Sequence, residues 1–296
     1  MSYLDRIREA NRYDPSDYRP FRVAGVDVGL ARHGFAESLR RWPDVFAVSE
    51  DCLCLAPALN AKDSDPKTRS TAVDTVVRQL HAEGKIGNWY DEAFPVSRCW
   101  NAAPLLLLER AALPFFGVPG YGVHVNGYVR EGQEIKLWVA RRAKDKPTFP
   151  GKLDHLVAGG QPFGISLEEN LVKECFEEAS IPRSCALLAR PAGRVRYAVD
   201  LGQGLRPDTI FVFDLELSPD FLPANTDGEV ESFHLWPLGE VSRRLQETTE
   251  FKYNCALVII DFLIRIGFIP KDHAEYAEIV TMLAAQAPGR LENDPR

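Results

Sequence analysis

Residues 159–181, GGQPFGISLEENLVKECFEEASI, join a glycine-rich loop to a helix and constrain the fold more than any other stretch of the chain. Ser166 and Glu169 have the spacing of a capping box, in which each side chain accepts the other residue's backbone N–H at the first turn of a helix. The residues that follow contain no helix breaker, and apolar side chains recur at a spacing of four, at Leu167, Leu171 and Cys175. The stretch therefore predicts a helix with one apolar face, beginning directly after the glycine loop.

Three carboxylates project from one face of this predicted helix. Glu174, Glu177 and Glu178 stand at positions i, i+3 and i+4, which share a helix face. Clustered carboxylates repel one another unless cations are bound, and Mg²⁺ prefers oxygen ligands of this kind. A solvated acidic face is the alternative interpretation, but the glycine loop at a fixed distance favours a metal site.

The stretch resembles the Nudix box, G-x5-E-x7-R-E-U-x-E-E-x-G-U, in which U is an aliphatic residue. The positions in register are Gly159, Glu174, Glu177, Glu178 and Ile181, with Cys175 in the aliphatic position. The departures are Ile165 for the first Glu, Lys173 for the Arg and Ser180 for the later Gly. The metal-binding part of the motif is thus complete.

The resemblance implies a metal-dependent diphosphate hydrolase. Its metal ligands would be the Gly159 carbonyl and the carboxylates of Glu174, Glu177 and Glu178, which would hold Mg²⁺ or Mn²⁺ on a diphosphate. Glu178 or Glu231 would be the base for the attacking water, and Lys173 would orient a carboxylate or a phosphate oxygen. Ile165 and Lys173 keep a second class open, a ligand-binding protein that has lost turnover.

Composition excludes several other classes. The net charge of −7 and pI near 5.5 provide no basic face for nucleic acid. The six cysteines show no CXXC spacing, which predicts reduced thiols rather than a disulfide framework. No apolar signal region or membrane-spanning run is evident, so we expect a cytoplasmic protein without a membrane segment.

The chain divides into two predicted domains. Residues 1–118 alternate between short helices and strands, which predicts a small α/β companion domain. Its polar residues Asp27, His33, Asp51 and His81 are scattered and form no catalytic pattern. Residues 119–285 contain the motif, and the resemblance implies an α/β/α sandwich with a mixed sheet there. Residues 286–296 are expected to be a flexible tail.

Further candidate site residues flank the motif. YGVHVNGYV and IKLWVARRA alternate as the strands of a hairpin. The basic residues after the hairpin would bind phosphate oxygens if they adjoin the site, the alternative being a solvated loop: Arg141, Arg142, Lys144 and Lys146. Aromatic candidates for a flat organic group, each of which could equally be core, are Trp138, Trp100, Phe115 and Phe116. Downstream, either Glu229 or Glu231 is a candidate extra metal ligand or base.

Outside the box the chain resembles one Nudix subfamily over essentially its whole length. The segments that carry this resemblance are LPFFGVPGYGVHVNGYV, LWVARRAKDKPTFPGKLDHLVAGGQPFGIS and EFKYNCALVIIDFLIRIG. The subfamily comprises two-domain plant and bacterial Nudix hydrolases related to the region that precedes the kinase in fungal thiamine pyrophosphokinases.

This subfamily resemblance implies hydrolysis of thiamine diphosphate, preferentially its oxidised forms, to the monophosphate. The alternatives are a Nudix hydrolase of another nucleoside diphosphate derivative, such as ADP-ribose, a sugar nucleotide or a dinucleotide, and the catalytically weak binding protein. The companion domain would either shape the site for the organic group or form a homodimer.

Overall fold

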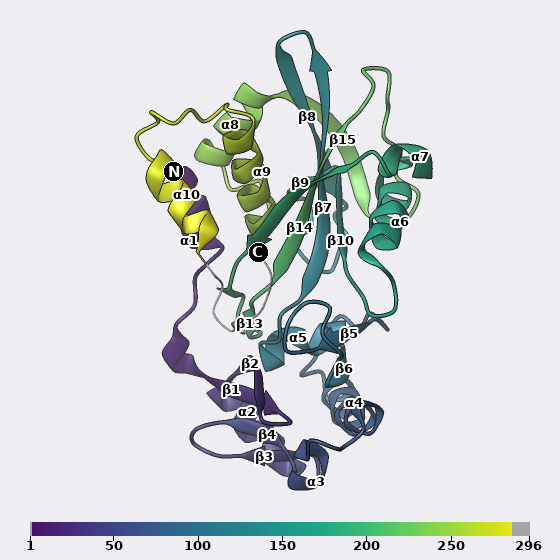
Figure 1. Ribbon diagram of the computed structural model, residues 1–296, viewed down its shortest axis with the longest axis vertical. Coiled ribbons are helices and arrows are strands. Elements are labelled where there is room, and N and C mark those ends of the chain that lie inside the picture. Colours follow the sequence, from purple (N-terminus) through teal and green to yellow (C-terminus); the bar gives the residue numbers. More distant parts are fainter. Residues whose placement is uncertain (1, 286–296) are drawn as a thin grey trace.

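The computed structural model describes residues 2–285 as a mixed α/β protein (Figure 1), which confirms the predicted fold class. The expected tail, 286–296, lies outside the described residues. The larger sheet has seven strands, five of them in the order β11-β14-β7-β8-β15, with β10 beside β7 and β9 beside β8. Only the β14–β7 pair among these is parallel, so the sheet is mixed. Its strands are β7 (Tyr121–Glu131), β8 (Glu134–Arg142), β9 (Leu153–His155), β10 (Val157–Gly160), β11 (Arg190–Arg196), β14 (Thr209–Glu216) and β15 (Val230–Pro237).

Helices cover both faces of this sheet, as Figure 1 shows. One face carries α6 (Leu167–Ala179) and α7 (Arg183–Ala186). The other carries α8 (Leu238–Glu247), α9 (Tyr253–Arg265) and α10 (Tyr276–Ala284). Helix α9 is apolar nearly all round and is almost entirely buried, as expected for a central core helix. The arrangement is the predicted α/β/α sandwich.

A smaller α/β unit lies beneath the sandwich and has its own hydrophobic core. Its four-stranded sheet has the order β2-β1-β4-β3. The elements are β1 (Tyr18–Val23), β2 (Val26–Arg32), α2 (His33–Ser38), β3 (Phe46–Val48), β4 (Leu53–Leu55), α3 (Pro57–Asn60), α4 (Pro66–Ala82), β5 (Ala93–Val96), β6 (Leu106–Glu109) and α5 (Leu113–Phe116). Strands β5 and β6 form a separate hairpin, and β12 (Val199–Asp200) and β13 (Leu205–Arg206) form another near the junction with the sandwich.

Helix α1 (Tyr3–Glu9) does not pack with the smaller unit that follows it in the chain. Its apolar face, Tyr3, Leu4 and Ile7, belongs to the core of the sandwich around α9. The Tyr3 hydroxyl lies 2.6 Å from Ser242 Oγ, and Arg6 Nε donates to the Leu245 carbonyl of α8 at 3.0 Å. The N-terminal helix therefore forms part of the sandwich in space.

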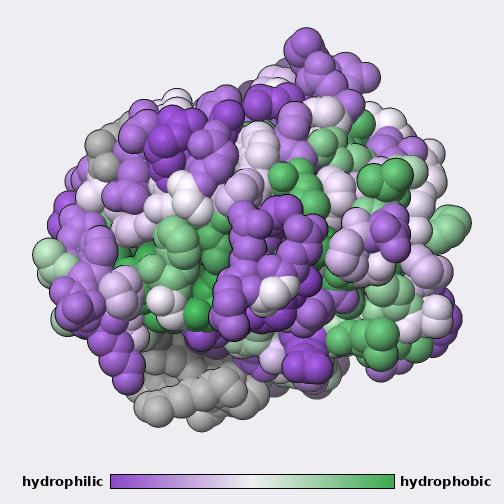
Figure 2. Space-filling model, turned by 90° about the horizontal axis from the view of Figure 1, so that it is seen from above, coloured by the Kyte–Doolittle hydropathy of each residue, from purple (hydrophilic) through white to green (hydrophobic). Residues whose placement is uncertain are grey.

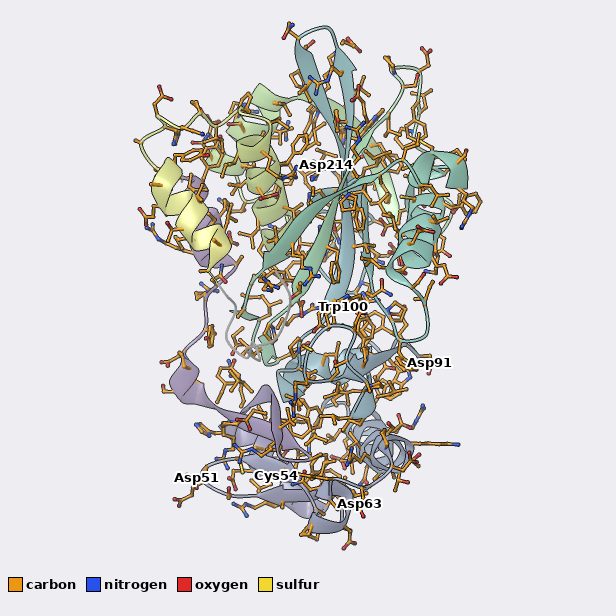
Figure 3. The ribbon with its side chains drawn as sticks, viewed as in Figure 1. Asp51, Cys54, Asp63, Asp91, Trp100 and Asp214 are labelled. Carbon is orange, nitrogen blue, oxygen red and sulfur yellow. The ribbon has the colours of Figure 1, made fainter. Side chains whose placement is uncertain are left out.

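Trp100 lies where the two units meet (Figure 3). Its ring centroid is 4.8 Å from that of Tyr121 and 4.5 Å from that of Phe211, two residues of the large sheet. Seen from above, hydrophobic and hydrophilic residues are interspersed over the surface (Figure 2). None of the helices within residues 2–285 combines the length and apolar content needed to cross a bilayer.

Candidate active site

The glycine loop and the helix predicted from the sequence both form. Strand β10 ends at Gly160, and α6 begins at Leu167 after the N-cap residue Ser166. Ser166 Oγ accepts the Glu169 N–H at 3.2 Å, and a Glu169 carboxylate oxygen accepts the Ser166 N–H at 3.1 Å. The predicted capping box is therefore present, and it fixes where the helix starts.

Helix α6 presents its carboxylates to the end of β10. A Glu178 carboxylate oxygen accepts the Ala158 N–H at 2.7 Å. Gly159 leaves room for Glu174, since a Cβ added at Gly159 would lie only 2.1 Å from the Glu174 carboxyl carbon. The close approach of strand and helix thus requires glycine at this position, and it brings the Gly159 backbone to the carboxylates.

Lys173 lies between two of these carboxylates. Its Nζ is 3.1 Å from Glu174 Oε1 and 2.8 Å from Glu177 Oε2. Burial alone would lower the pKa of Lys173, but the hydrogen bond to Glu177 and the charge of Glu174 outweigh it and raise that pKa. The lysine therefore stays charged and holds the two side chains on one side of the helix.

The burial of the carboxylates fits a cation site. Burial, with the charge of Lys173 opposing it, raises the pKa of Glu174. Burial and then the neighbouring charge of Glu174 raise the pKa of Glu178 well above its usual value. Ionising such buried carboxylates is costly without a counterion. Their ionisation becomes favourable when a hard divalent cation binds and supplies the positive charge. The donor set around Gly159 thus fits Mg²⁺ or Mn²⁺.

The carboxylates open into a cavity of about 450 Å³. Six of the side chains that line it are cationic: Arg110, Arg142, Lys146, Lys173, Arg206 and Lys252. Six others are acidic: Glu92, Glu174, Glu177, Glu178, Asp227 and Glu229. An anion held on metals at the acidic end would meet the guanidinium and ammonium groups of the same cavity.

The structure brings some of the predicted residues to this cavity and not others. Gly159, Lys173, the three carboxylates of α6, Arg142 and Glu229 line it. Among the described residues, its lining does not include Arg141, Lys144, Trp138 or Glu231. Arg141 donates to the Gly151 carbonyl at 2.8 Å, and Lys144 pairs with Glu231 at 3.1 Å. Trp138 is buried in the core beneath α6. Arg141 and Arg142 differ because successive strand residues point to opposite faces.

Comparison with known proteins decides the family. The chain is 43% identical over 290 residues to "Nudix hydrolase 20, chloroplastic" of Arabidopsis thaliana, covering 95% of this chain and 77% of that protein. It is 42% identical over 284 residues to "Nudix hydrolase 24, chloroplastic" of the same plant, with the same coverage. The chain belongs to the Nudix hydrolases. It is a Nudix-type diphosphate hydrolase, and enzymes of this family generally use divalent metal ions.

Two further comparisons concern parts of the chain. Residues 2–120 match a protein-family model described as "Domain of unknown function (DUF4743)". A crystal structure of a MutT/nudix family protein from Enterococcus faecalis matches 57% of this chain and 70% of that chain, with 12% identity and a TM-score of 0.41.

Sequence reasoning missed three cationic residues that line this cavity, Arg110, Arg206 and Lys252. Each comes from an element distant in the chain from the Nudix box: the turn after β6, strand β13, and the N-cap of α9. Lys252 Nζ lies 3.5 Å from Asp154 Oδ2, which also accepts a hydrogen bond from Arg142 at 3.0 Å. No local pattern marks these residues, because only the tertiary fold brings them together.

A buried polar cluster lies next to Arg142 and Lys252, two residues that line the cavity at the α6 carboxylates. His124, Asp154, His155 and Cys255 offer ligand atoms that all lie within 4.8 Å of one another. However, Arg142 and Lys252 both approach Asp154, and their positive charges oppose binding of a metal ion there. Burial alone would raise the pKa of Asp154, but the charges of Lys252 and Arg142 outweigh it and hold that pKa far below its usual range. The cluster thus anchors two cations of the cavity.

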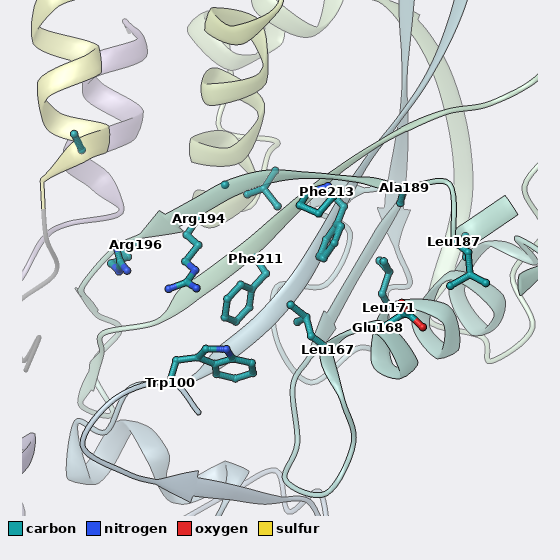
Figure 4. Close-up of a pocket in the computed structure, with 15 residues that line it drawn as sticks. Trp100, Leu167, Glu168, Leu171, Leu187, Ala189, Arg194, Arg196, Phe211 and Phe213 are labelled. Carbon is teal, nitrogen blue, oxygen red and sulfur yellow. The ribbon is translucent and has the colours of Figure 1, made fainter. Parts of the chain in front are cut away.

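A second and larger cavity, of about 970 Å³, lies in the sandwich beside α6, β11 and β14, and Trp100 of the small unit adds to its lining (Figure 4). Trp100, Phe211 and Leu167 face it, and Arg194 lies over the Phe211 ring at 5.0 Å. Its mainly apolar lining suits a diphosphate less well than the charged cavity at α6.

Proposed function

We propose that this Nudix hydrolase cleaves thiamine diphosphate, or preferentially its oxidised forms, to the monophosphate and phosphate with Mg²⁺ or Mn²⁺. The observation that supports the diphosphate hydrolysis is that one cavity combines the α6 carboxylates with six cationic side chains. The choice of thiamine compounds is supported by the resemblance of the segments outside the Nudix box.

The proposed metal ligands are the Gly159 carbonyl, Glu174, Glu177 and Glu178, with Glu229 assisting. When bound, the divalent ions would neutralise charge on the diphosphate and make the attacking water more acidic. Glu229 is favoured over Glu231 as the assisting carboxylate because Glu229 lines the cavity, where it pairs with Lys146.

The chain's own residues then bind the substrate and move one proton. Arg142 and Lys252 would bind phosphate oxygens, held in place by Asp154. Lys173 would orient Glu174 and Glu177. The oxygen of water bonds to one phosphorus, the bridging P–O bond breaks, and Glu178 takes the proton of the water. The products are the monophosphate and inorganic phosphate.

The test is release of phosphate and of monophosphate products with Mg²⁺ from a panel of thiamine diphosphate, its oxidised analogues, ADP-ribose, a dinucleoside polyphosphate and a nucleoside triphosphate. We expect turnover of the thiamine compounds and a loss of about 100-fold or more in Glu178→Gln, because the proton acceptor is removed. Turnover of another compound alone would refute the thiamine assignment. Binding without turnover of any compound would support the catalytically weak binding protein.

The remaining assignments are also proposals. We propose domains at 1–118 and 119–285, with α1 packed on the second, and a cytoplasmic location. All six cysteines are free thiols, which is consistent with a reducing compartment. Homodimerisation stays a prediction that the mass of the protein in solution will test.

A further inference from the structure

The small N-terminal unit contributes a wall to the catalytic cavity. Seven lining residues belong to this unit: Pro114 lies in α5, and the other six precede α5 in the chain, namely Gly87, Asn88, Tyr90, Glu92, Arg110 and Ala111. This segment lies within the part of the chain that matches the domain of unknown function. The cavity is therefore built by both units.

Arg110 of this wall lies beside the glycine loop. A Cβ added at Gly160 would lie 3.6 Å from the guanidinium carbon of Arg110. Gly160 follows Gly159 in β10, and successive strand residues point to opposite faces, so Arg110 and Glu174 approach the strand from opposite sides. Both side chains line the same cavity, so the guanidinium faces it from the side opposite Glu174.

The position of the Arg110 guanidinium is fixed by its neighbours in the small unit. Arg110 lies over the Tyr90 ring, 4.5 Å from its centroid, and donates from Nη1 to Glu92 Oε2 at 2.9 Å. Its backbone N–H is bonded to the Glu92 carbonyl at 2.9 Å, and the Tyr90 N–H is bonded to Glu109 Oε1 at 3.1 Å. A guanidinium has five N–H donors, so the bond to Glu92 leaves donors that can face a phosphate. Held by ring and carboxylate, it loses little freedom on binding an anion.

We propose that Arg110 binds a phosphate oxygen of the diphosphate substrate, and that the N-terminal unit thereby completes the active site of this hydrolase. The inference rests on the proposed function for its substrate class, an organic diphosphate. The same wall, which also includes Asn88 and Tyr90, would face the organic group and limit its size. The unit of unknown function is thus a part of the substrate-binding site.

The experiment compares Arg110→Ala with Arg41→Ala in the full chain. Arg41 is the matched control, since it also belongs to the small unit, pairs with a glutamate, Glu83, at 2.7 Å, and lies over an aromatic ring, Trp42, at 4.6 Å. Its side chain is 47% exposed, and it does not line the catalytic cavity. Both variants remove the same groups, so effects on folding alone will be similar.

We expect Arg110→Ala to raise KM for the diphosphate by about 10- to 100-fold, as for loss of one charge-assisted hydrogen bond, with Arg41→Ala within about twofold of wild type. Arg110→Lys retains the positive charge but not the planar guanidinium, so we expect it to restore part of the affinity. If Arg110→Ala does not fold, Arg110→Lys takes its place in the comparison. A wild-type KM in a folded Arg110→Ala protein would overturn the proposal.

A second measurement separates this inference from the proposed function. Methylenebisphosphonate with Mg²⁺ is titrated calorimetrically into wild type and both variants, which requires no turnover. If wild type hydrolyses none of the panel but binds the bisphosphonate, and only Arg110→Ala weakens that binding, then the substrate assignment fails and the role of Arg110 stands. If hydrolysis is present and all three proteins bind equally, the role of Arg110 fails and the function stands.

Discussion

Asp154 does not line the cavity, but it holds in place two cationic side chains that do, Arg142 and Lys252. Its side chain is buried, and Oδ2 accepts from Arg142 and lies 3.5 Å from Lys252. Its other oxygen accepts the His155 N–H at 2.9 Å and the Cys255 thiol. A carboxylate with all of its acceptor sites occupied is rigid, and it holds both cations at the cavity wall.

We expect Asp154→Asn to raise KM for the diphosphate and to lower stability by about 3 kcal/mol, because it leaves two largely buried cations beside a neutral amide. The measurement is steady-state kinetics well below the melting temperature, together with urea unfolding. A general loss of stability would lower the active fraction and hence kcat, whereas loosened cations would change KM.

Asp261→Asn is the matched control for this prediction. Asp261 is also a carboxylate paired with an arginine, Arg265, at 2.7 Å, but it is half-buried, lies on α9 and does not line the cavity. Equal changes of KM in the two variants would contradict a positioning role for Asp154.

At this scale the sequence predicts the residues whose chemistry is local. Glu174, Glu177 and Glu178 are recognisable because one helix places them at fixed offsets. Arg110 and Lys252 are not, because a lone arginine or lysine carries no pattern and its position in the site depends on contacts between distant elements. Arg141 and Arg142 are an intermediate case. Strand alternation predicts that they point to opposite faces of the sheet, but only the folded sheet shows which of the two faces the cavity.

At the scale of elements, the contact between β10 and α6 is the feature that the site depends on most. The strand and the helix approach so closely at Gly159 that a methyl group there would overlap the Glu174 side chain. Because Glu174 is also held by Lys173 on the same helix, it cannot move away without breaking that ion pair.

We therefore expect Gly159→Ala to lower kcat/KM by about 100-fold or more, as expected when a reacting group is displaced by about 1 Å. Steady-state assays over a range of Mg²⁺ concentrations will show a higher metal requirement, because Glu174 is displaced. Gly239→Ala is the control, since Gly239 lies in α8 with nothing within 4 Å of an added Cβ. Normal metal dependence in Gly159→Ala would argue against this packing.

The elements themselves were largely predictable. The capping box gave the start of α6 at Leu167, and the alternation in 121–142 predicted the two strands of the hairpin β7–β8. These signals are local, because caps and alternation depend only on neighbouring residues. Such local signals do not predict the pairing of β7 with β14 and β10. The paired residues are 88 positions apart in the chain for β14 and about 36 for β10.

At the scale of the whole molecule, chain order and spatial order differ at the N-terminus. The sequence predicts short helices and strands in residues 1–118, and the first helix, α1, forms at Tyr3–Glu9. Its partners could not be predicted, because an amphipathic helix shows which face is buried but not against what. The chain starts in the sandwich, passes through the small unit and returns to the sandwich at β7 (Figure 1). The two units are thus connected by two segments rather than one.

This arrangement predicts that a core substitution in α1 will destabilise the sandwich. Ile7 is 1% exposed and packs in the same core as the α9 residues, whereas Leu80 of α4 is buried in the core of the small unit. Truncating either side chain to alanine costs about 2–5 kcal/mol. We expect Ile7→Ala to speed backbone hydrogen exchange in α9 and α8, and Leu80→Ala to speed it in β1 and β4.

Hydrogen exchange followed by mass spectrometry distinguishes the two effects, because it locates the loss of protection in the chain. Faster exchange in β1 and β4 of Ile7→Ala, with α9 unchanged, would assign α1 to the small unit instead. The expected result would also bear on the proposed active site, since Lys252 is the N-cap residue of α9 and lines the cavity. Loosening α9 through Ile7 should therefore raise KM at temperatures just below unfolding, while Leu80→Ala should act on KM only through the Arg110 wall.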